Sequence, residues 1–286
     1  MSKLNLKNQD NKSSIKRDDV CMLCNSKALE IVYYSNSVWK VNRCSSCSFA
    51  WVVDIVERSH NTSFSWNQEI VNESSLRNNM YIDRLNRVKC LHPNPFNWLD
   101  VGCGGGGMLN CVKNNGFKAE GIELSPSADT ISKLYDIQVH RNVLKDTISA
   151  LSQDKYGVIS YFHVIEHIED PINELMIVRE LLSDDGLLVI EVPYFDSFFW
   201  KIFKHHHRHF YRSHLNYFNL NSMTTMLSGC GFNILNIDSV PYSMSIGWIL
   251  KRLGLSYFSS LLSSKMLNKT VNINSGEYLF VIANKK

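Results

Sequence analysis

The chain has 286 residues, 44% of them hydrophobic, and a formal net charge of +3. This length fits one large α/β domain with a small appendage, and the apolar content is sufficient for a full core. This net charge is too small for a dedicated nucleic-acid-binding protein, which has a strong excess of basic residues. The apolar runs are shorter than the roughly 18–20 residues that a membrane-spanning helix needs.

The N-terminal 19 residues are polar and charged, and they lack the apolar segment of a signal peptide. We expect residues 1–19 to form a disordered tail and the protein to be cytoplasmic. Composition then changes three times along the chain. We expect a metal-binding ribbon over residues 20–55, a linker and an N-terminal helix over residues 56–92, and the main α/β domain over residues 93–286.

Four of the eight cysteines form two C-x2-C pairs with 19 residues between them, namely Cys21, Cys24, Cys44 and Cys47. Each such turn presents two thiolates to one tetrahedral ion. The spacing therefore predicts a structural Zn²⁺ site in a zinc ribbon of two hairpin strands. Four unrelated thiols and a redox pair are the alternatives.

A glycine-rich turn follows the apolar run that ends in Asp100, with Gly102, Gly104 and Gly106 among its residues. A helix pattern resumes directly after it, so we predict a strand, a tight turn and a helix N-terminus. Glycines allow positive φ angles and let a ligand approach the main chain closely. Residues 119–123 predict a second strand that ends in Glu123, where a carboxylate is placed to accept ribose hydroxyls. This arrangement indicates an adenosine-type cofactor.

The acid at the strand end discriminates between cofactors. Gly102, Gly104 and Gly107 satisfy the dinucleotide pattern G-x-G-x-x-G, but a carboxylate at Asp100 would repel a pyrophosphate. It would attract the sulfonium and ammonium groups of S-adenosylmethionine. The pattern Asp100-x-Gly102-x-Gly104-x-Gly106 resembles motif I of the class I S-adenosylmethionine-dependent methyltransferases. A glycine turn without any ligand is the alternative.

Two later segments extend this resemblance, which covers about residues 80–286. The strand over residues 156–162 leads into Glu166-His167 and then Asp170-Pro171. We expect an amphipathic helix over residues 174–182, closed by Asp-Asp-Gly at residues 184–186, and a fifth strand over residues 186–193. The resemblance implies an α/β, doubly wound, seven-stranded Rossmann-like sheet of order 3-2-1-4-5-7-6, with strand seven antiparallel. It also implies that Phe162 and His163 line the cofactor pocket.

The candidate catalytic residues are His167 and His214. Ligands of open parallel sheets bind beyond the carboxyl ends of the strands. His167 follows the fourth strand, over residues 156–162, so we expect it at that edge of the sheet. His214 begins a segment that resembles the His-containing segment of sugar and quinone methyltransferases. Either imidazole could act as a base toward a hydroxyl. For His167, a hydrogen bond to a nearby carboxylate is the structural alternative. The run from His205 to His209 fits a solvated loop, an acceptor site or, least well, a metal site.

A zinc ribbon ahead of such a domain resembles the sugar C-methyltransferases. This resemblance implies a small-molecule acceptor, namely a sugar or nucleotide sugar of surface-polysaccharide or natural-product biosynthesis. It leaves open whether an oxygen, a nitrogen or a carbon atom is methylated. A ribosomal RNA base methyltransferase and a non-catalytic binding module are the alternatives. The apolar stretch over residues 248–262 fits a core segment, a homodimer contact or a face for a lipid-linked acceptor.

Overall fold

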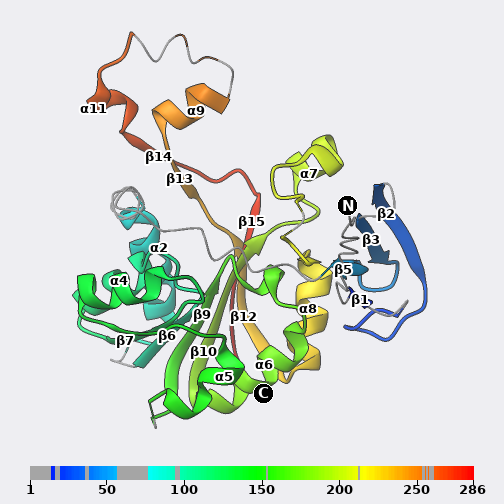
Figure 1. Ribbon diagram of the computed structural model, residues 1–286, viewed down its shortest axis with the longest axis horizontal. Helices are drawn as coiled ribbons and strands as arrows, with labels where there is room; N and C mark the ends of the chain where they lie inside the picture. Colours follow the sequence, from blue (N-terminus) through cyan, green and yellow to red (C-terminus); the bar gives the residue numbers. More distant parts are fainter. Residues whose placement is uncertain are drawn as a thin grey trace, which may run out of the picture.

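A computed structural model of the protein describes residues 14–16, 20–35, 39–56, 77–93, 97–152, 154–211, 213–252, 255, 257 and 261–286 (Figure 1). Its centre is a seven-stranded sheet in which the last strand of the chain is antiparallel to both neighbours. In spatial order the strands are β8 (Gln138–His140), β7 (Lys118–Ile122), β6 (Asn97–Val101), β9 (Tyr156–Phe162), β10 (Leu182–Pro193), β15 (Tyr278–Lys285) and β12 (Phe232–Ser239). This is the order 3-2-1-4-5-7-6, so the predicted doubly wound Rossmann-like fold is confirmed.

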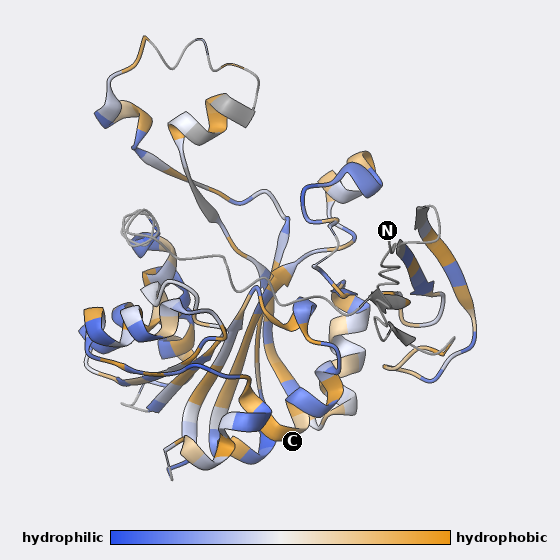
Figure 2. Cartoon of the chain, viewed as in Figure 1, coloured by the Kyte–Doolittle hydropathy of each residue, from blue (hydrophilic) through white to orange (hydrophobic). Residues whose placement is uncertain are grey.

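Helices cover both faces of the sheet because side chains alternate along each buried strand. Trp98 and Val189 pack toward α2 (Asn78–Leu91) and α3 (Gly107–Asn114). Their neighbours Leu99 and Ile190 pack toward α6 (Pro171–Leu181) and α8 (Leu220–Gly229). Figure 2 shows the apolar strands between these layers. The other elements of the sheet domain are α4 (Ser127–Tyr135), α5 (Leu144–Thr147), and the 3-10 turns η1 (Ile148–Ala150) and η2 (Ile165–His167).

The cysteine-rich segment forms a larger sheet than the predicted two-stranded ribbon. Its order is β11 (Asn216–Tyr217), β4 (Ala50–Val52), β3 (Trp39–Cys44) and β2 (Leu29–Ser35). Ala50–Val52 is fully buried, so its backbone must find partners on both sides. Phe49 stacks on Trp51 and packs against Phe218, with ring centroids 5.5 and 5.3 Å apart. The ribbon and the main sheet therefore share one continuous core.

Part of the segment expected to be a disordered tail is ordered. Ser14–Lys16 forms β1, which pairs antiparallel with β5 (Asp54–Val56). Lys16 lies opposite Asp54 in the register of this ladder. Residues 57–76, which belong to the segment expected to contain the linker, lie outside the described residues.

The helix expected from Glu174 begins one turn earlier, at Pro171, because the Asp170 side chain accepts a hydrogen bond from the Asn173 amide and caps it. It ends at Leu181. The sequence Asp-Asp-Gly at residues 184–186, expected to close this helix, lies within β10, where the register shifts between Leu182 and Leu187. A β-bulge therefore takes the place of the predicted turn.

The histidine-rich insert is also more ordered than a solvated loop. It contains α7 (Phe198–Phe203) and η3 (Lys204–His206), and the following His207 and His214 are buried. An arm beside it consists of β13 (Tyr242–Ser245), α9 (Ile246–Arg252), α11 (Ser264–Leu267) and β14 (Thr270–Ile273). Figure 1 shows that α7 and this arm both project beyond the carboxyl ends of β9 and β10.

Candidate active site

The glycine turn between β6 and α3 forms one wall of the site. Gly102, Gly104 and Gly106 all have positive φ angles, of 70°, 53° and 72°. A Cβ atom on Gly102 would lie 2.5 Å from a methyl group of Val164, so this position tolerates only glycine. The same contact brings the turn against the segment that follows β9. The predicted cofactor turn and the predicted catalytic segment are therefore direct neighbours.

Asp100 lies beneath this turn and is buried. Its carboxylate accepts a 2.6 Å hydrogen bond from the Ser160 hydroxyl, which in turn accepts one from the indole N–H of Trp98 at 2.8 Å. An indole can only donate, so the Ser160 proton is directed to Asp100. Burial raises the pKa of Asp100 to about 7, against the lowering effect of the Ser160 hydrogen bond. A cationic ligand would favour its charged form.

Glu123 follows β7 and reaches across to the glycine turn. One carboxylate oxygen accepts a 2.8 Å hydrogen bond from the Gly104 amide, and the other accepts one from the Ser125 amide at the same distance. The side chain is half-buried. The predicted ribose acid therefore lies at the mouth of the turn, with both oxygens oriented by the backbone.

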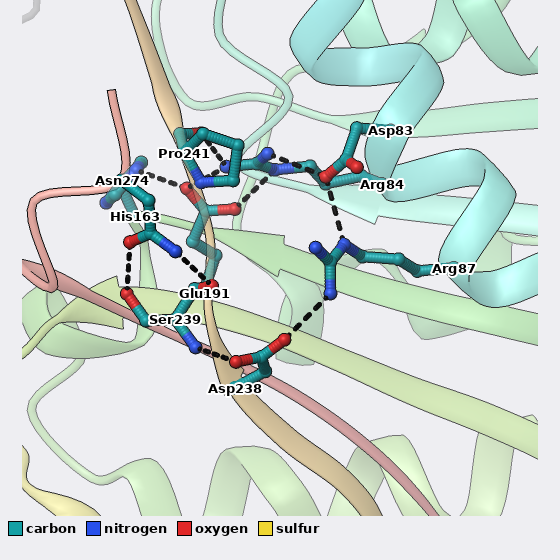
Figure 3. A network of polar contacts seen from close by, with 9 residues as sticks. All are labelled: Asp83, Arg84, Arg87, His163, Glu191, Asp238, Ser239, Pro241 and Asn274. Atoms are coloured by element: carbon teal, nitrogen blue, oxygen red, sulfur yellow. Dashed lines mark hydrogen bonds and ion pairs between the residues drawn. The ribbon is translucent and has the colours of Figure 1, made fainter. Parts of the chain in front are cut away.

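A buried ion pair between Arg84 and Glu191 lies beside His163 (Figure 3). Arg84 of α2 donates two hydrogen bonds to Glu191 of β10, at 2.8 and 3.1 Å, and a third to the Pro241 carbonyl. His163 Nε2 lies 3.3 Å from the same carboxylate. Burial alone would raise the pKa of Glu191, but His163 and Arg84 lower it to about 2.

His163 has a φ of 60°, which is unusual for a residue with a side chain and is a strained conformation. Two contacts hold it there. Its amide donates to the Glu191 carbonyl at 2.8 Å, and its ring meets Tyr278 edge-on with centroids 5.0 Å apart. Phe162, the other residue expected to line the cofactor pocket, is half-buried and packs on the side of the sheet that faces α2 and α3.

The two candidate catalytic histidines are neighbours although 46 residues separate them in the chain. The ring centroids of His167 and His214 are 4.7 Å apart. Backbone contacts explain the proximity: the Leu215 amide donates to the Glu166 carbonyl, and the buried Asn216 side chain donates to the carbonyls of Ile165 and Ile168. The short segment before α8 is thus held against η2.

The Glu166 carboxylate lies between the imidazoles of His163 and His214. The carboxylate is 3.9 Å from His214 Nε2 and 3.8 Å from His163 Nδ1, and neither oxygen accepts a hydrogen bond from any residue that the structure describes. Burial raises the pKa of Glu166, although His167 and His163 partly offset this. Ligand atoms of Glu166, His167 and His214 lie within 4.8 Å of one another, a spacing that a metal ion could also bridge.

The two histidines differ in environment. His214 is 3% exposed, and burial together with the nearby His167 lowers its pKa to about 2, so its imidazole stays neutral. His167 is exposed, and its Nδ1 is 2.7 Å from the Ser213 carbonyl. A carbonyl only accepts, so Nδ1 of His167 carries the proton and Nε2 keeps a lone pair.

A small hollow borders this cluster. It is lined by Pro193, Tyr194, Phe195, Trp200, His209, His214, Asn216 and Tyr217. Burial, and then Arg208, lowers the pKa of His209 to about 2, and its Nε2 has no hydrogen-bond partner in the described part of the chain. The hollow therefore combines aromatic walls with neutral imidazole nitrogens.

The cysteine cluster is about as compact as a tetrahedral site requires. Cys21 Sγ is 3.5 Å from Cys47 Sγ, and Cys24 Sγ is 3.5 Å from Cys44 Sγ. All four sulfur atoms lie within 4.8 Å of one another. Three of the four residues are buried. Such a closed set of four thiols matches the donor set of structural zinc. The run from His205 to His209 contributes to neither of the clusters with metal-ligand spacing found among the described residues.

This fold and site define an S-adenosylmethionine-dependent methyltransferase of class I. Residues 74–237 match the model of a family described as "Methyltransferase domain", and the chain belongs to that family. Its cofactor is S-adenosylmethionine, as the acid at position 100 predicted. The dinucleotide alternative was wrong.

Similar proteins include two ubiquinone biosynthesis O-methyltransferases. The one from Cereibacter sphaeroides is 30% identical over 105 residues, which cover 34% of this chain and 42% of the relative. The one from Nitrosospira multiformis is 30% identical over 93 residues, covering 31% and 39%. The match thus spans less than half the length of these relatives.

Solved methyltransferase structures share the fold. One from Archaeoglobus fulgidus has a TM-score of 0.53 and 16% identity, covering 77% of this chain and 100% of that one. A possible histamine N-methyltransferase from Thermotoga maritima has a TM-score of 0.50 and 17% identity, covering 79% and 98%.

Sequence reasoning missed the buried pair of Arg84 and Glu191, together with Asn216 and His209. A signal for Glu191 was present, because an acid within the apolar run Leu187–Val192 needs a buried partner. The sequence does not identify this partner, because Arg84 lies 107 positions before Glu191. Asn216 acts through backbone carbonyls, which leave no trace in a sequence.

Proposed function

We propose that the protein transfers a methyl group from S-adenosylmethionine to a hydroxyl of a small-molecule acceptor, with a sugar or nucleotide sugar as the first candidate. The observation that carries this proposal is the cluster of His167, His214 and Glu166 beside the glycine turn. Methyl transfer from a sulfonium needs an aligned acceptor and the exclusion of water, and a hydroxyl acceptor also needs a base.

His167 is the proposed base. Its Nδ1–H is oriented by the Ser213 carbonyl, so its Nε2 can take the proton of the acceptor. The buried carboxylate of Glu166 would stabilise the imidazolium that results. His214, neutral and buried, would accept or donate a hydrogen bond that positions the acceptor.

On the cofactor side, Asp100 would face the cationic part of S-adenosylmethionine. Glu123 would exchange its amide contacts for the ribose hydroxyls. The backbone of Gly102, Gly104 and Gly106 would lie against the ligand, and Phe162 and His163 would line its pocket. These roles follow from the location of each residue around one turn.

An aromatic hydroxyl is the second candidate acceptor. Two observations favour it: the hollow has four aromatic walls, and the curated relatives act in ubiquinone biosynthesis. Aromatic walls also pack against sugar rings, so the lining alone does not decide between the two candidates.

The experiment compares turnover of wild type, His167→Ala and His214→Ala with labelled S-adenosylmethionine, first on a panel of nucleotide sugars and then on catechols. We expect His167→Ala to slow turnover by about 10²–10⁴-fold and to remove the fall in rate at low pH that protonation of a general base causes. S-adenosylhomocysteine affinity should be unchanged, which controls for folding. Unaltered turnover and pH dependence in both variants would refute the assignment of a histidine base.

We also propose that Cys21, Cys24, Cys44 and Cys47 bind one structural Zn²⁺ as thiolates. Free thiols at this density require a reducing compartment, which agrees with the expected cytoplasmic location. Elemental analysis of protein from zinc-replete expression should find about one zinc per chain.

A further inference from the structure

The C-terminal third of the chain differs sharply in charge from the rest. Residues 197–286 contain ten lysine and arginine residues but only two acids, Asp238 and Glu277, whereas residues 1–196 contain 20 basic and 25 acidic residues. Both C-terminal acids are already engaged: Asp238 pairs with Arg87, and Glu277 pairs with Arg208. With ten basic and two acidic residues, this region keeps a net excess of eight positive charges.

Helix α7 displays large apolar side chains to solvent. Phe198, Ile202 and Phe203 are 69%, 56% and 50% exposed, while Trp200 on the inner side lines the hollow. Exposed Lys201 and Lys204 lie among them. A monomeric protein rarely leaves clustered aromatic and aliphatic side chains uncovered without a partner for them.

The arm repeats this combination. Tyr257 and Leu261 are 81% and 71% exposed, Met266 of α11 is 50% exposed, and Lys265 and Lys269 beside them are exposed too. Figure 2 shows that α7 and the arm stand at the same end of the molecule, beyond the carboxyl ends of the central strands. That is the end where the hollow and the histidine cluster lie.

We propose that the exposed side chains of α7, together with Tyr257, Leu261 and Met266 of the arm, form a docking surface for an anionic phospholipid bilayer. Exposed aromatic and aliphatic side chains insert at the level of the headgroups, and neighbouring lysines pair with anionic lipids. The interspersed apolar residues distinguish this surface from a nucleic-acid site, which would have cationic and polar side chains at its centre. Among the described residues, no helix is long and apolar enough to cross a bilayer, so the attachment is peripheral.

Docking in this orientation has a consequence for the acceptor, which rests on the proposed function. Trp200 joins the membrane face of α7 to the wall of the hollow. An acceptor whose ring sits in the hollow could keep an apolar chain in the bilayer. The acceptor class is then a hydroxyl-bearing ring attached to a lipid.

The test is co-sedimentation of the full chain with vesicles of phosphatidylcholine alone or with one-third phosphatidylglycerol. We expect wild type to bind the anionic vesicles at least about tenfold more tightly and to be released by salt. The double variant Phe198→Ser/Ile202→Ser should weaken this binding about tenfold or more. Lys201→Glu/Lys204→Glu should weaken it about 30-fold.

Matched controls separate this surface from general stickiness. Ile148→Ser/Met176→Ser removes two side chains that are each 44% exposed on α6 and η1, and Lys133→Glu changes an exposed lysine of α4. These variants should bind as wild type does. All variants should keep S-adenosylhomocysteine affinity, which reports folding independently of any acceptor.

Three outcomes would overturn the proposal: equal binding to neutral and anionic vesicles, equal loss in the control variants, or no binding by wild type. Tighter binding of a structured RNA oligonucleotide that the α7 variants abolish would assign the surface to nucleic acid instead. A wild-type dimer that Phe198→Ser/Ile202→Ser dissociates would assign it to a second copy of the chain. Failure of methyl transfer to sugars or phenols would leave vesicle binding unaffected, so the two proposals fail separately.

Discussion

Replacing Asp100 by Asn should remove a pH dependence from cofactor binding. The carboxylate is buried and its pKa is raised to about 7, so near neutral pH the free protein is a mixture of charged and uncharged forms. A sulfonium or ammonium group binds the charged form preferentially. Binding therefore depresses this pKa and releases a proton, and affinity rises as the pH rises through about 7.

The size of the change in cofactor affinity follows from the fraction of Asp100 that is ionised. At pH 6 about one-tenth of Asp100 is charged and at pH 8 about nine-tenths, so affinity should rise roughly tenfold across this interval. Asp100→Asn should bind more weakly at pH 8 and lack the increase. Titration calorimetry in two buffers of different ionisation enthalpy measures both the affinity and the proton released. The matched control is Glu123→Gln, which should weaken binding and keep the increase with pH, moved to lower pH because the Glu123 charge helps to raise the pKa of Asp100.

The same shift acts on stability with the opposite sign. The folded-state pKa lies above the unfolded value near 3.8, so the contribution of Asp100 is present at low pH and lost as the pH rises from about 4 to 7. The loss amounts to about 4 kcal/mol at most. Asp100→Asn should therefore melt at a higher temperature than wild type at pH 8 without cofactor. A wild-type affinity that is flat between pH 6 and 8, together with no such stabilisation, would refute this reasoning.

Three further variants test other parts of the site. Glu123→Ala should weaken S-adenosylhomocysteine binding by about 1.5–3 kcal/mol, the contribution of hydrogen bonds to a charged group, and an unchanged affinity in calorimetry would contradict its ribose role. Arg84→Met leaves Glu191 charged and buried and should cost about 3–5 kcal/mol in urea unfolding, much of it recovered by adding Glu191→Gln. Cys44→Ser should lose bound zinc and slow turnover while S-adenosylhomocysteine affinity stays near wild type, since the cysteine sheet contacts the His214 segment rather than the glycine turn.

Local signals predicted most of the fold correctly. Hydrophobic runs and their turn residues located the strand at Tyr156–Phe162 with both ends correct, and the glycine turn with its flanking acid identified the cofactor class. The errors occurred where a distant partner decides the local structure. The segment Asp184–Gly186 carries turn residues, yet pairing of β10 with β9 on either side turns it into a bulge. The strand Asn216–Tyr217 is two residues long and exists because β4 lies beside it.

The candidate site also contains positions that local signals predict and positions that depend on distant partners. Asp100 lies at the carboxyl end of β6 and Glu123 directly follows β7, and these ends meet at one edge of the sheet, so strand order alone brings both residues to the glycine turn. The proximity of His214 to His167 depends instead on hydrogen bonds from Leu215 and Asn216 to the backbone of η2, which no side-chain pattern reveals. The resemblance of residues 214–219 to a methyltransferase segment nominated His214, but the physical reason for its position is visible only in the folded chain.

These contacts give the cysteine-rich segment a role beyond its own stability. β11 continues directly from His214 and pairs with β4, and the Val52 amide donates to the Leu215 carbonyl at 2.9 Å. The residues that orient His214 are thus bound on one side by η2 and on the other by the ribbon sheet. Removing the ribbon would leave the edge of β11 unpaired and release the wall of the acceptor hollow that contains His214, Asn216 and Tyr217. A metal-stabilised ribbon can therefore influence methyl transfer without contacting either substrate, because it fixes the backbone on which the histidine is carried.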